Sequence, residues 1–105
     1  DIGQHFPSDD ERWRDAPSRK FLEHAKHLMY EKGYTAVNID ATVILQTPEL
    51  RSYISEIREN IARVLSISVD TVSVKATTTD HLGFTGSGDG IAATAVALLT
   101  KKNGN

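Results

Sequence analysis

Residues 70–80 of the chain read Asp-Thr-Val-Ser-Val-Lys-Ala-Thr-Thr-Thr-Asp, a strand pattern that runs directly into a polar end. Val72, Val74 and Ala76 alternate with other residues, which predicts a β-strand over residues 70–77 with one face in the core. Three threonines and an aspartate close the stretch. Because backbone groups at strand ends are free to bind ligands, we expect this polar run to belong to a functional edge of the sheet.

The residues ahead of this strand predict two helices and another strand. Apolar residues recur at helical spacing over residues 18–32, where Asp15 or Ser18 can cap the start and Gly33 can end the helix. Residues 34–46 are rich in Val, Ile and Thr and predict a strand whose far end is buried on both faces. Pro48 is expected in the first turn of a second helix. The apolar stripe of that helix comprises Leu50, Ile54, Ile57, Ile61 and Val64, and its water-facing residues comprise Arg51, Glu56, Arg58, Glu59 and Arg63.

The remaining segments are less regular. Residues 1–17 are polar and interrupted by two prolines, which is typical of a loop. Residues 83–90 hold four of the seven glycines, at a spacing that is neither a P-loop nor a dinucleotide-binding fingerprint. Residues 91–100 are apolar, and periodicity alone leaves both a buried strand and a short helix open there. The order of elements predicts helices and strands combined on one sheet.

Composition restricts the function classes. A length of 105 residues supports one domain, residues 1–105. The net charge of -2 argues against a general surface for nucleic acid or anionic membranes, and no apolar run reaches the roughly 20 residues that span a bilayer. The absence of cysteine excludes disulfides, thiolate metal sites and cysteine nucleophiles. Because the chain opens on Asp1 without an element ahead of it, we expect a domain that is incomplete at its N-terminus.

Three places in the chain could carry chemistry. The run from Thr77 to Asp80 combines hydroxyls with a carboxylate, which suits phosphate oxygens beside a hard divalent ion, although Asp80 could equally cap the next turn. The glycines of residues 83–90 indicate a close approach of the backbone to a ligand or to another chain. Asp1 and Gly3 could bind a vicinal diol, or could belong to an ordinary loop.

The histidines offer a weaker alternative. His24 and His27 have a helical spacing that can chelate a metal, but charged neighbours favour a solvated helix face. His5 and His81 are isolated in the sequence. No serine or threonine has the histidine and acid partners that nucleophilic catalysis requires.

Four separated blocks of the chain together resemble the 2-C-methyl-D-erythritol 2,4-cyclodiphosphate synthases of the non-mevalonate route to isoprenoids. The blocks are Asp1-Ile2-Gly3-x-x-Phe6-Pro7, Lys32-Gly33-Tyr34, Gln46-x-Pro48 and the stretch Val74-Lys75-Ala76-Thr77-Thr78-Thr79-Asp80-x-Leu82-Gly83-Phe84-Thr85-Gly86. The resemblance covers essentially the whole chain as the C-terminal two-thirds of the family's domain. It implies an α+β fold, in which a mixed β-sheet carries helices on one side and makes residues 91–100 a strand.

The resemblance also implies an activity and an assembly. The family forms homotrimers with active sites between neighbouring subunits. Its members convert 4-diphosphocytidyl-2-C-methyl-D-erythritol 2-phosphate to 2-C-methyl-D-erythritol 2,4-cyclodiphosphate and release CMP, as lyases that act on a phosphorus–oxygen bond. The implied cofactors are zinc and a Mg²⁺ or Mn²⁺ ion that binds with the diphosphate. The implied localisation is the bacterial cytoplasm or a plastid, with neither nucleic acid nor membrane as a partner.

Residue roles follow from the matched positions. Thr78 matches the threonine that stabilises the transition state, Asp80 the acidic ligand of the Mg²⁺ or Mn²⁺ ion, and Phe84 an aromatic near the trimer axis. Asp1 and Gly3 match the pair that binds the ribose, and residues 45–51 match the segment that encloses cytosine. The full set of expected substrate-binding residues is Asp1, Ile2, Gly3, Phe6, Pro7, Ser8, Asp9, Asp10, Leu45, Gln46, Thr47, Pro48, Glu49, Leu50, Arg51, Thr77, Thr78, Thr79, Asp80, Phe84 and Ser87.

The chain departs from the family pattern at several positions. Asp80 replaces the usual glutamate and is one methylene shorter, and Ser87 stands where many members have arginine. Ser8-Asp9-Asp10 differs from the commoner Asp-Thr-Asp. The family's zinc ligands precede the Asp-Ile-Gly block, so we expect them outside this chain. The alternative hypotheses are an inactive fragment that binds cytidine nucleotides and an assembly role for residues 83–90.

Overall fold

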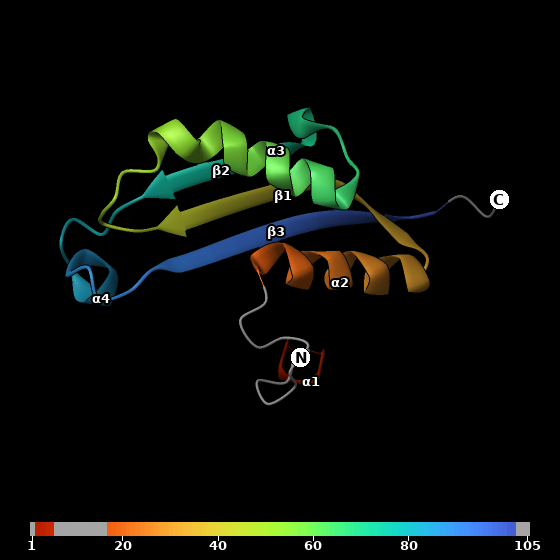
Figure 1. The fold of residues 1–105 in the computed structure, drawn as a ribbon, viewed down its shortest axis with the longest axis horizontal. Helices are drawn as coiled ribbons and strands as arrows, with labels where there is room; N and C mark the ends of the chain where they lie inside the picture. The colour runs from red at the N-terminus through yellow and green to blue at the C-terminus, as the bar shows by residue number, and fades with distance from the viewer. Residues whose placement is uncertain (1, 6–16, 103–105) are drawn as a thin grey trace.

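The computed structural model describes residues 2–5 and 17–102. Two long helices and three strands make up most of this part, joined by short helical turns (Figure 1). The elements in chain order are α1 (Ile2–His5), α2 (Ser18–Glu31), β1 (Tyr34–Ile44), the 3-10 turn η1 (Arg51–Tyr53), α3 (Ile54–Leu65), the 3-10 turn η2 (Val69–Thr71), β2 (Val72–Thr77), α4 (Gly83–Gly86) and β3 (Ala92–Lys101).

The three strands form one mixed sheet in the order β2-β1-β3. β1 pairs with β2 in parallel, from Ile39 opposite Val72 to Ile44 opposite Thr77. β3 pairs with β1 in the antiparallel direction, with a register shift between Ala36 and Asn38. The sheet confirms the predicted α+β class, and residues 92–100 of the segment left open form a strand, which extends to Lys101.

Both long helices lie on the same face of the sheet (Figure 1). The buried centre of the core consists of Ala62 on α3 with Val72 and Val74 on β2. Ile54, Ile57 and Ile61 of the predicted stripe pack against this centre. Because the spacing of about 3.6 residues per turn brings these isoleucines to one face, the sequence pattern identified the packing surface of α3 correctly.

The helix boundaries differ from the predictions at the two prolines. α2 begins at Ser18, but Pro17 holds the N-cap position without a side-chain hydrogen bond, so Ser18 is not the cap; Asp15 lies outside the described residues. Pro48 does not enter a helix: it follows a cis peptide bond from Thr47, and α3 begins only at Ile54. Gly33 ends α2 as predicted, with a positive φ of 84° that favours glycine.

Two further expectations are corrected by the packing. Arg58 does not face water, because its Nε donates to the carbonyl oxygen of Val72 at 2.7 Å and its Nη2 to that of Val69 at 2.9 Å. The far end of β1 is half-buried rather than buried on both faces, since the helices cover only one side of the sheet. The strand predicted over residues 70–77 begins at Val72, after the turn η2, in which Ser68 Oγ accepts from the Asp70 N–H at 3.3 Å.

Within the part of the chain that the structure describes, the face of the sheet opposite the helices is open. Val96 and Leu98 of β3 are 72% and 55% exposed, and they lie opposite Asp40 and Asn38 of β1. Asp40 forms an ion pair with Lys75 of β2 across this face. Among the described residues, no helix has both the length and the apolar character needed to cross a lipid bilayer.

Candidate functional site

The strand pairing brings two of the predicted site segments to one edge of the sheet. Because β1 and β2 are parallel, their carboxyl ends meet, with Ile44 beside Thr77. The Leu45 N–H donates to the Thr77 carbonyl oxygen at 3.0 Å and extends the pairing by one bond. Beyond this point the 45–51 loop and residues 77–80, which we call the threonine corner, leave the sheet side by side (Figure 1).

A cavity of about 430 Å³ lies between the 45–51 loop and the threonine corner. Its volume suits a ligand of nucleotide size. Its lining residues come from both segments, from the last residues of β2 and from the start of α3. They are Leu45, Gln46, Pro48, Glu49, Leu50, Arg51, Ile54, Ala76, Thr77 and Thr78. The structure thus brings together most of the predicted cytosine segment and two of the predicted diphosphate threonines.

Two of the lining residues, Ile54 and Ala76, were not among the predicted site residues. Ile54 is the first residue of α3 and Ala76 is the penultimate residue of β2, so each carries an apolar side chain to the edge of the cavity. The helical spacing of Ile54 and the strand alternation of Ala76 indicated core positions instead. An apolar wall beside polar loop groups is usual in small-molecule sites, where aliphatic carbon covers the flat surface of a ligand.

Hydroxyl groups of the threonine corner have different surroundings. Thr78 Oγ1 accepts from the Asp80 N–H at 3.2 Å and lies 3.5 Å from Asp80 Oδ1. Thr79 Oγ1 donates to the Leu82 carbonyl oxygen at 2.5 Å and lies 3.1 Å from Thr85 Oγ1, which is buried. Thr79 is therefore part of the internal support of the corner, whereas Thr77 and Thr78 are exposed at the cavity.

The backbone turns sharply where the corner ends, at two consecutive residues. Asp80 and His81 have φ angles of 53° and 68°, the left-handed region that residues with a Cβ rarely adopt. The His81 N–H donates to Oε1 of Gln46, in the facing loop, at 3.0 Å. On its other side, His81 lies against Gly86 of α4, where a Cβ would come within 2.2 Å of the His81 carbonyl carbon. The turn is thus held between the 45–51 loop and α4.

Charge at the cavity comes from one exposed pair. Arg51 Nη2 lies 3.3 Å from Glu49 Oε1, and the two side chains are 90% and 74% exposed. Among the described residues that line the cavity, Arg51 carries the positive charge. An ion pair this exposed contributes little to stability, so Arg51 remains available to an anionic ligand at small energetic cost.

The other predicted site residues lie away from this cavity or outside the described part of the chain. Phe84 belongs to α4, is 61% exposed and packs close to Gly90. Ser87 Oγ makes hydrogen bonds to the Phe84 carbonyl oxygen at 3.1 Å and to Asp89 Oδ2 at 2.7 Å. Ile2 and Gly3 fall in α1, which lies beyond α2 and far from the strand ends (Figure 1). The residues that fall outside the described part are Asp1, Phe6, Pro7, Ser8, Asp9 and Asp10.

Metal-binding side chains are sparse in the described structure. Within residues 2–5 and 17–102, histidine and acidic side chains form no group of three that could hold a metal ion. His27 Nε2 lies 3.0 Å from Glu31 Oε1, a contact within one face of α2. Asp80 is exposed, and its carboxylate lies beside the Thr78 hydroxyl at the cavity. One carboxylate, completed by ligand phosphates and water, is a usual protein contribution to a Mg²⁺ site.

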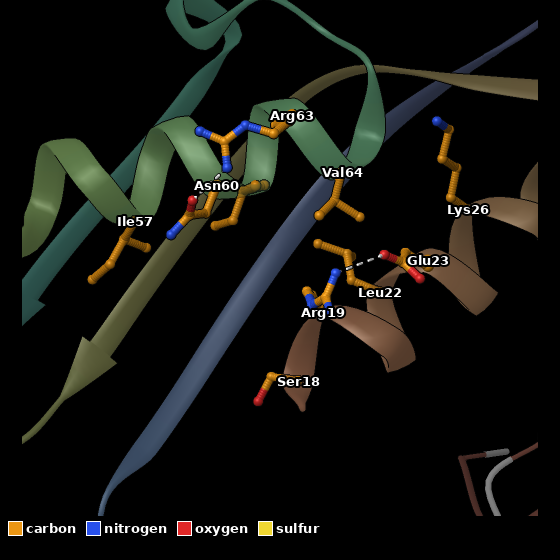
Figure 2. A pocket seen from close by; sticks show the side chains of 10 residues that line it. Ser18, Arg19, Leu22, Glu23, Lys26, Ile57, Asn60, Arg63 and Val64 are labelled. Carbon is orange, nitrogen blue, oxygen red and sulfur yellow. Dashed lines mark hydrogen bonds and ion pairs between the residues drawn. The ribbon is translucent and has the colours of Figure 1, made fainter. Parts of the chain in front are cut away.

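A larger cavity of about 940 Å³ lies between α2 and α3, and Figure 2 shows its walls. Leu22, Ile57 and Val64 form an aliphatic floor between the two helices. The polar side chains at its rim interact with their neighbours: Arg63 Nη1 donates to Asn60 Oδ1 at 2.8 Å, and Arg19 lies 3.9 Å from Glu23. None of the predicted site residues lines it, so it is distinct from the site at the strand ends.

The fold and the site define a class: an α+β domain with a nucleotide-sized cavity where two parallel strands end. Within that class the chain belongs to the YgbB family, because the sequence model of the YgbB family matches residues 1–100.

Individual relatives share a single description. The chain is 52% identical over 99 residues to the 2-C-methyl-D-erythritol 2,4-cyclodiphosphate synthase of Xanthomonas oryzae pv. oryzae, a match that covers 94% of the chain and 61% of the relative. It is also 52% identical over 102 residues to the synthase of Bacillus pumilus, which covers 97% of the chain and 65% of the relative. The chain therefore spans somewhat less than two-thirds of the length of these relatives.

A solved structure agrees with the sequence matches. The chain superimposes on a Plasmodium falciparum IspF, solved as a CDP complex, with a TM-score of 0.82 and 37% sequence identity. The superposition covers 98% of this chain and 61% of that structure. The fold predicted from the resemblance is thus shared with a protein that holds CDP.

Proposed function

We propose that the chain forms the cytidine-diphosphate part of a 2-C-methyl-D-erythritol 2,4-cyclodiphosphate synthase. The observation that carries this proposal is the cavity of about 430 Å³ that joins the 45–51 loop to Thr77 and Thr78. The CDP complex of a relative with the same fold supports cytidine diphosphate as the ligand. The cytosine would lie in the 45–51 loop, and the diphosphate would extend toward the threonine corner.

The reaction proposed for this site is an intramolecular phosphoryl transfer. An oxygen of the substrate's 2-phosphate attacks the β-phosphorus of the diphosphate, one phosphorus–oxygen bond forms, and the bond from that phosphorus to the bridging oxygen of CMP breaks. CMP leaves with the bond's electron pair, and the cyclic diphosphate remains. Such a step depends on alignment and charge stabilisation more than on a protein nucleophile. Thr78 would donate its hydroxyl hydrogen to the oxygens that gain charge, and Thr77 would hold the diphosphate.

The divalent ion of the proposed reaction would rest on Asp80. Its exposed carboxylate beside the Thr78 hydroxyl offers oxygen ligands, the type that Mg²⁺ and Mn²⁺ prefer. When bound, such an ion supplies positive charge to the diphosphate oxygens. For zinc, the described residues provide no ligand group, so no step is assigned to it.

The proposed assembly is the homotrimer implied by the resemblance. The open face of the sheet supports it, because Val96 and Leu98 expose apolar surface there that a neighbouring subunit could bury. Phe84, 61% exposed on α4, would lie near the trimer axis. In the proposed trimer each active site lies between neighbouring subunits. Asp1 and Gly3 would bind the ribose there, and residues 6–10 would lie beside the substrate.

The test uses the full-length polypeptide that contains this chain, supplied with zinc, Mg²⁺ and the diphosphocytidyl substrate. We expect CMP release, and we expect Thr78→Val to lower kcat by about 10²–10³-fold, as loss of one transition-state donor does in other enzymes. Thr100→Val, at the opposite end of the sheet, is the matched control and should leave the rate unchanged. Failure of the wild-type protein to release CMP would refute the enzymatic proposal, and CDP binding without turnover would favour the inactive binding fragment.

A further inference from the structure

The side chain of Gln46 connects the two halves of the proposed site. Its Oε1 accepts a hydrogen bond of 3.0 Å from the His81 backbone N–H, 35 positions later in the sequence. Gln46 lines the cavity from the 45–51 loop, and His81 follows the threonine corner directly. This side-chain contact therefore joins the cytosine side to the diphosphate side, in addition to the backbone bond from the Leu45 N–H to the Thr77 carbonyl oxygen.

The position of this bond matters because of the backbone that donates it, at His81. Asp80 and His81 both have positive φ, which is unfavourable for residues that carry a Cβ. Within the corner, the Asp80 N–H is bound by Thr78 Oγ1, and the Leu82 N–H by the Thr79 carbonyl oxygen at 3.1 Å. The His81 N–H points instead toward the other loop, where Gln46 receives it. The second left-handed residue is thus held from outside the corner.

We propose that Gln46 is a positioning residue, whose amide oxygen holds the left-handed His81 peptide and thereby sets Thr77 and Thr78 at the correct distance from the 45–51 loop. This inference rests on the proposed function, since it concerns the same cavity. It assigns to the Gln46 side chain a role separate from the enclosure of cytosine by the backbone of residues 45–51.

The principal variant is Gln46→Met in the full-length polypeptide, which keeps the length of the side chain and removes the acceptor. Loss of one hydrogen bond should weaken CDP binding about fivefold by calorimetric titration. The matched control is Asn60→Leu, which removes an amide from the exposed part of α3 and should leave the affinity unchanged. Gln46→Glu keeps an acceptor oxygen, so amide hydrogen exchange at His81 should stay as slow as in the wild type, whereas Gln46→Met should accelerate it.

A rescue experiment separates positioning from general destabilisation. Glycine adopts positive φ about as readily as negative φ, so His81→Gly should need the Gln46 bond much less. In the His81→Gly background, Gln46→Met should then weaken CDP binding by only about twofold. A merely structural role for Gln46 would give the same loss in both backgrounds.

The outcomes distinguish this inference from the proposed function. If the wild-type protein does not bind CDP, the proposed function fails, while the exchange rate at His81 still decides whether Gln46 holds that peptide. If Gln46→Met binds CDP as tightly as the wild type, or leaves exchange at His81 unchanged, the positioning role is overturned. An equal loss of affinity in the wild-type and His81→Gly backgrounds would also overturn it.

Discussion

The contact between α4 and the threonine corner makes Gly86→Ala the most informative single substitution. Gly86 is buried, and a Cβ built on it would lie 2.2 Å from the carbonyl carbon of His81, 2.7 Å from its Cα and 2.9 Å from its oxygen. All three atoms belong to the backbone, so no side chain can rotate away to make room. Because the φ of Gly86 is not in the left-handed region, the steric effect of the added methyl group is isolated from backbone strain.

The size of the expected effect follows from that distance. Ordinary contacts of a Cβ begin at 3.4 Å, so His81 or α4 must move by roughly 1 Å to admit the methyl group. Overpacking of this kind costs about 1–3 kcal/mol, and the preference of helices for alanine over glycine returns at most about 1 kcal/mol. A shift of about 1 Å in the threonine corner should also reduce turnover by about 10²-fold.

The assay combines urea unfolding with CMP release in the full-length polypeptide. We expect Gly86→Ala to lower both the free energy of unfolding and kcat. Gly33→Ala is the control, because Gly33 has a φ of 84° with open space around it and lies at the far end of the sheet. It should cost about 1–2 kcal/mol of stability through backbone strain and leave kcat unchanged. If Gly86→Ala unfolds and turns over like the wild type, the argument that α4 supports the corner is wrong.

Two further predictions concern stability and assembly. Arg58→Met should lower the free energy of unfolding by roughly 1–3 kcal/mol, because the carbonyl oxygens of Val69 and Val72 lose a charged donor. The affinity for CDP should stay unchanged, and an unaltered urea midpoint would contradict this prediction. Val96→Lys places a charge on the open sheet face, so light scattering should show species smaller than the proposed trimer. Glu59→Lys on α3 is the control and should leave the trimer intact. A trimeric Val96→Lys variant would place the interface elsewhere.

Local patterns anticipated much of this fold. Helical spacing in residues 18–32 and in the stripe Ile54, Ile57 and Ile61 placed two helices, and alternation through Val72 and Val74 placed a strand. These signals work because burial on one face imposes a period on the sequence itself. The assignment of residues 91–100 to a strand required the family resemblance, since an unbroken apolar run carries no period.

Errors arose where a residue's role depends on a distant neighbour. Arg58 looked like a solvated charge on its helix, yet Val69 of η2 and Val72 of β2 each present a carbonyl oxygen to it. Pro48 looked like the start of a helix, but the loop that closes the cavity takes its place and delays the helix until Ile54. In both cases the neighbouring residues in the sequence do not reveal the tertiary contact that decides the outcome.

Within the candidate site, residue types pointed to the threonine corner, and the family resemblance added the 45–51 loop as a separate segment. Their meeting in one cavity depends on the parallel pairing of β1 with β2, which aligns the two carboxyl ends. The same strand pairing brings Gln46 to the His81 N–H, and Gly86 closely approaches His81 from its other side. Periodicity records which face of an element is buried, whereas contacts between loops 35 positions apart exist only once the sheet has formed.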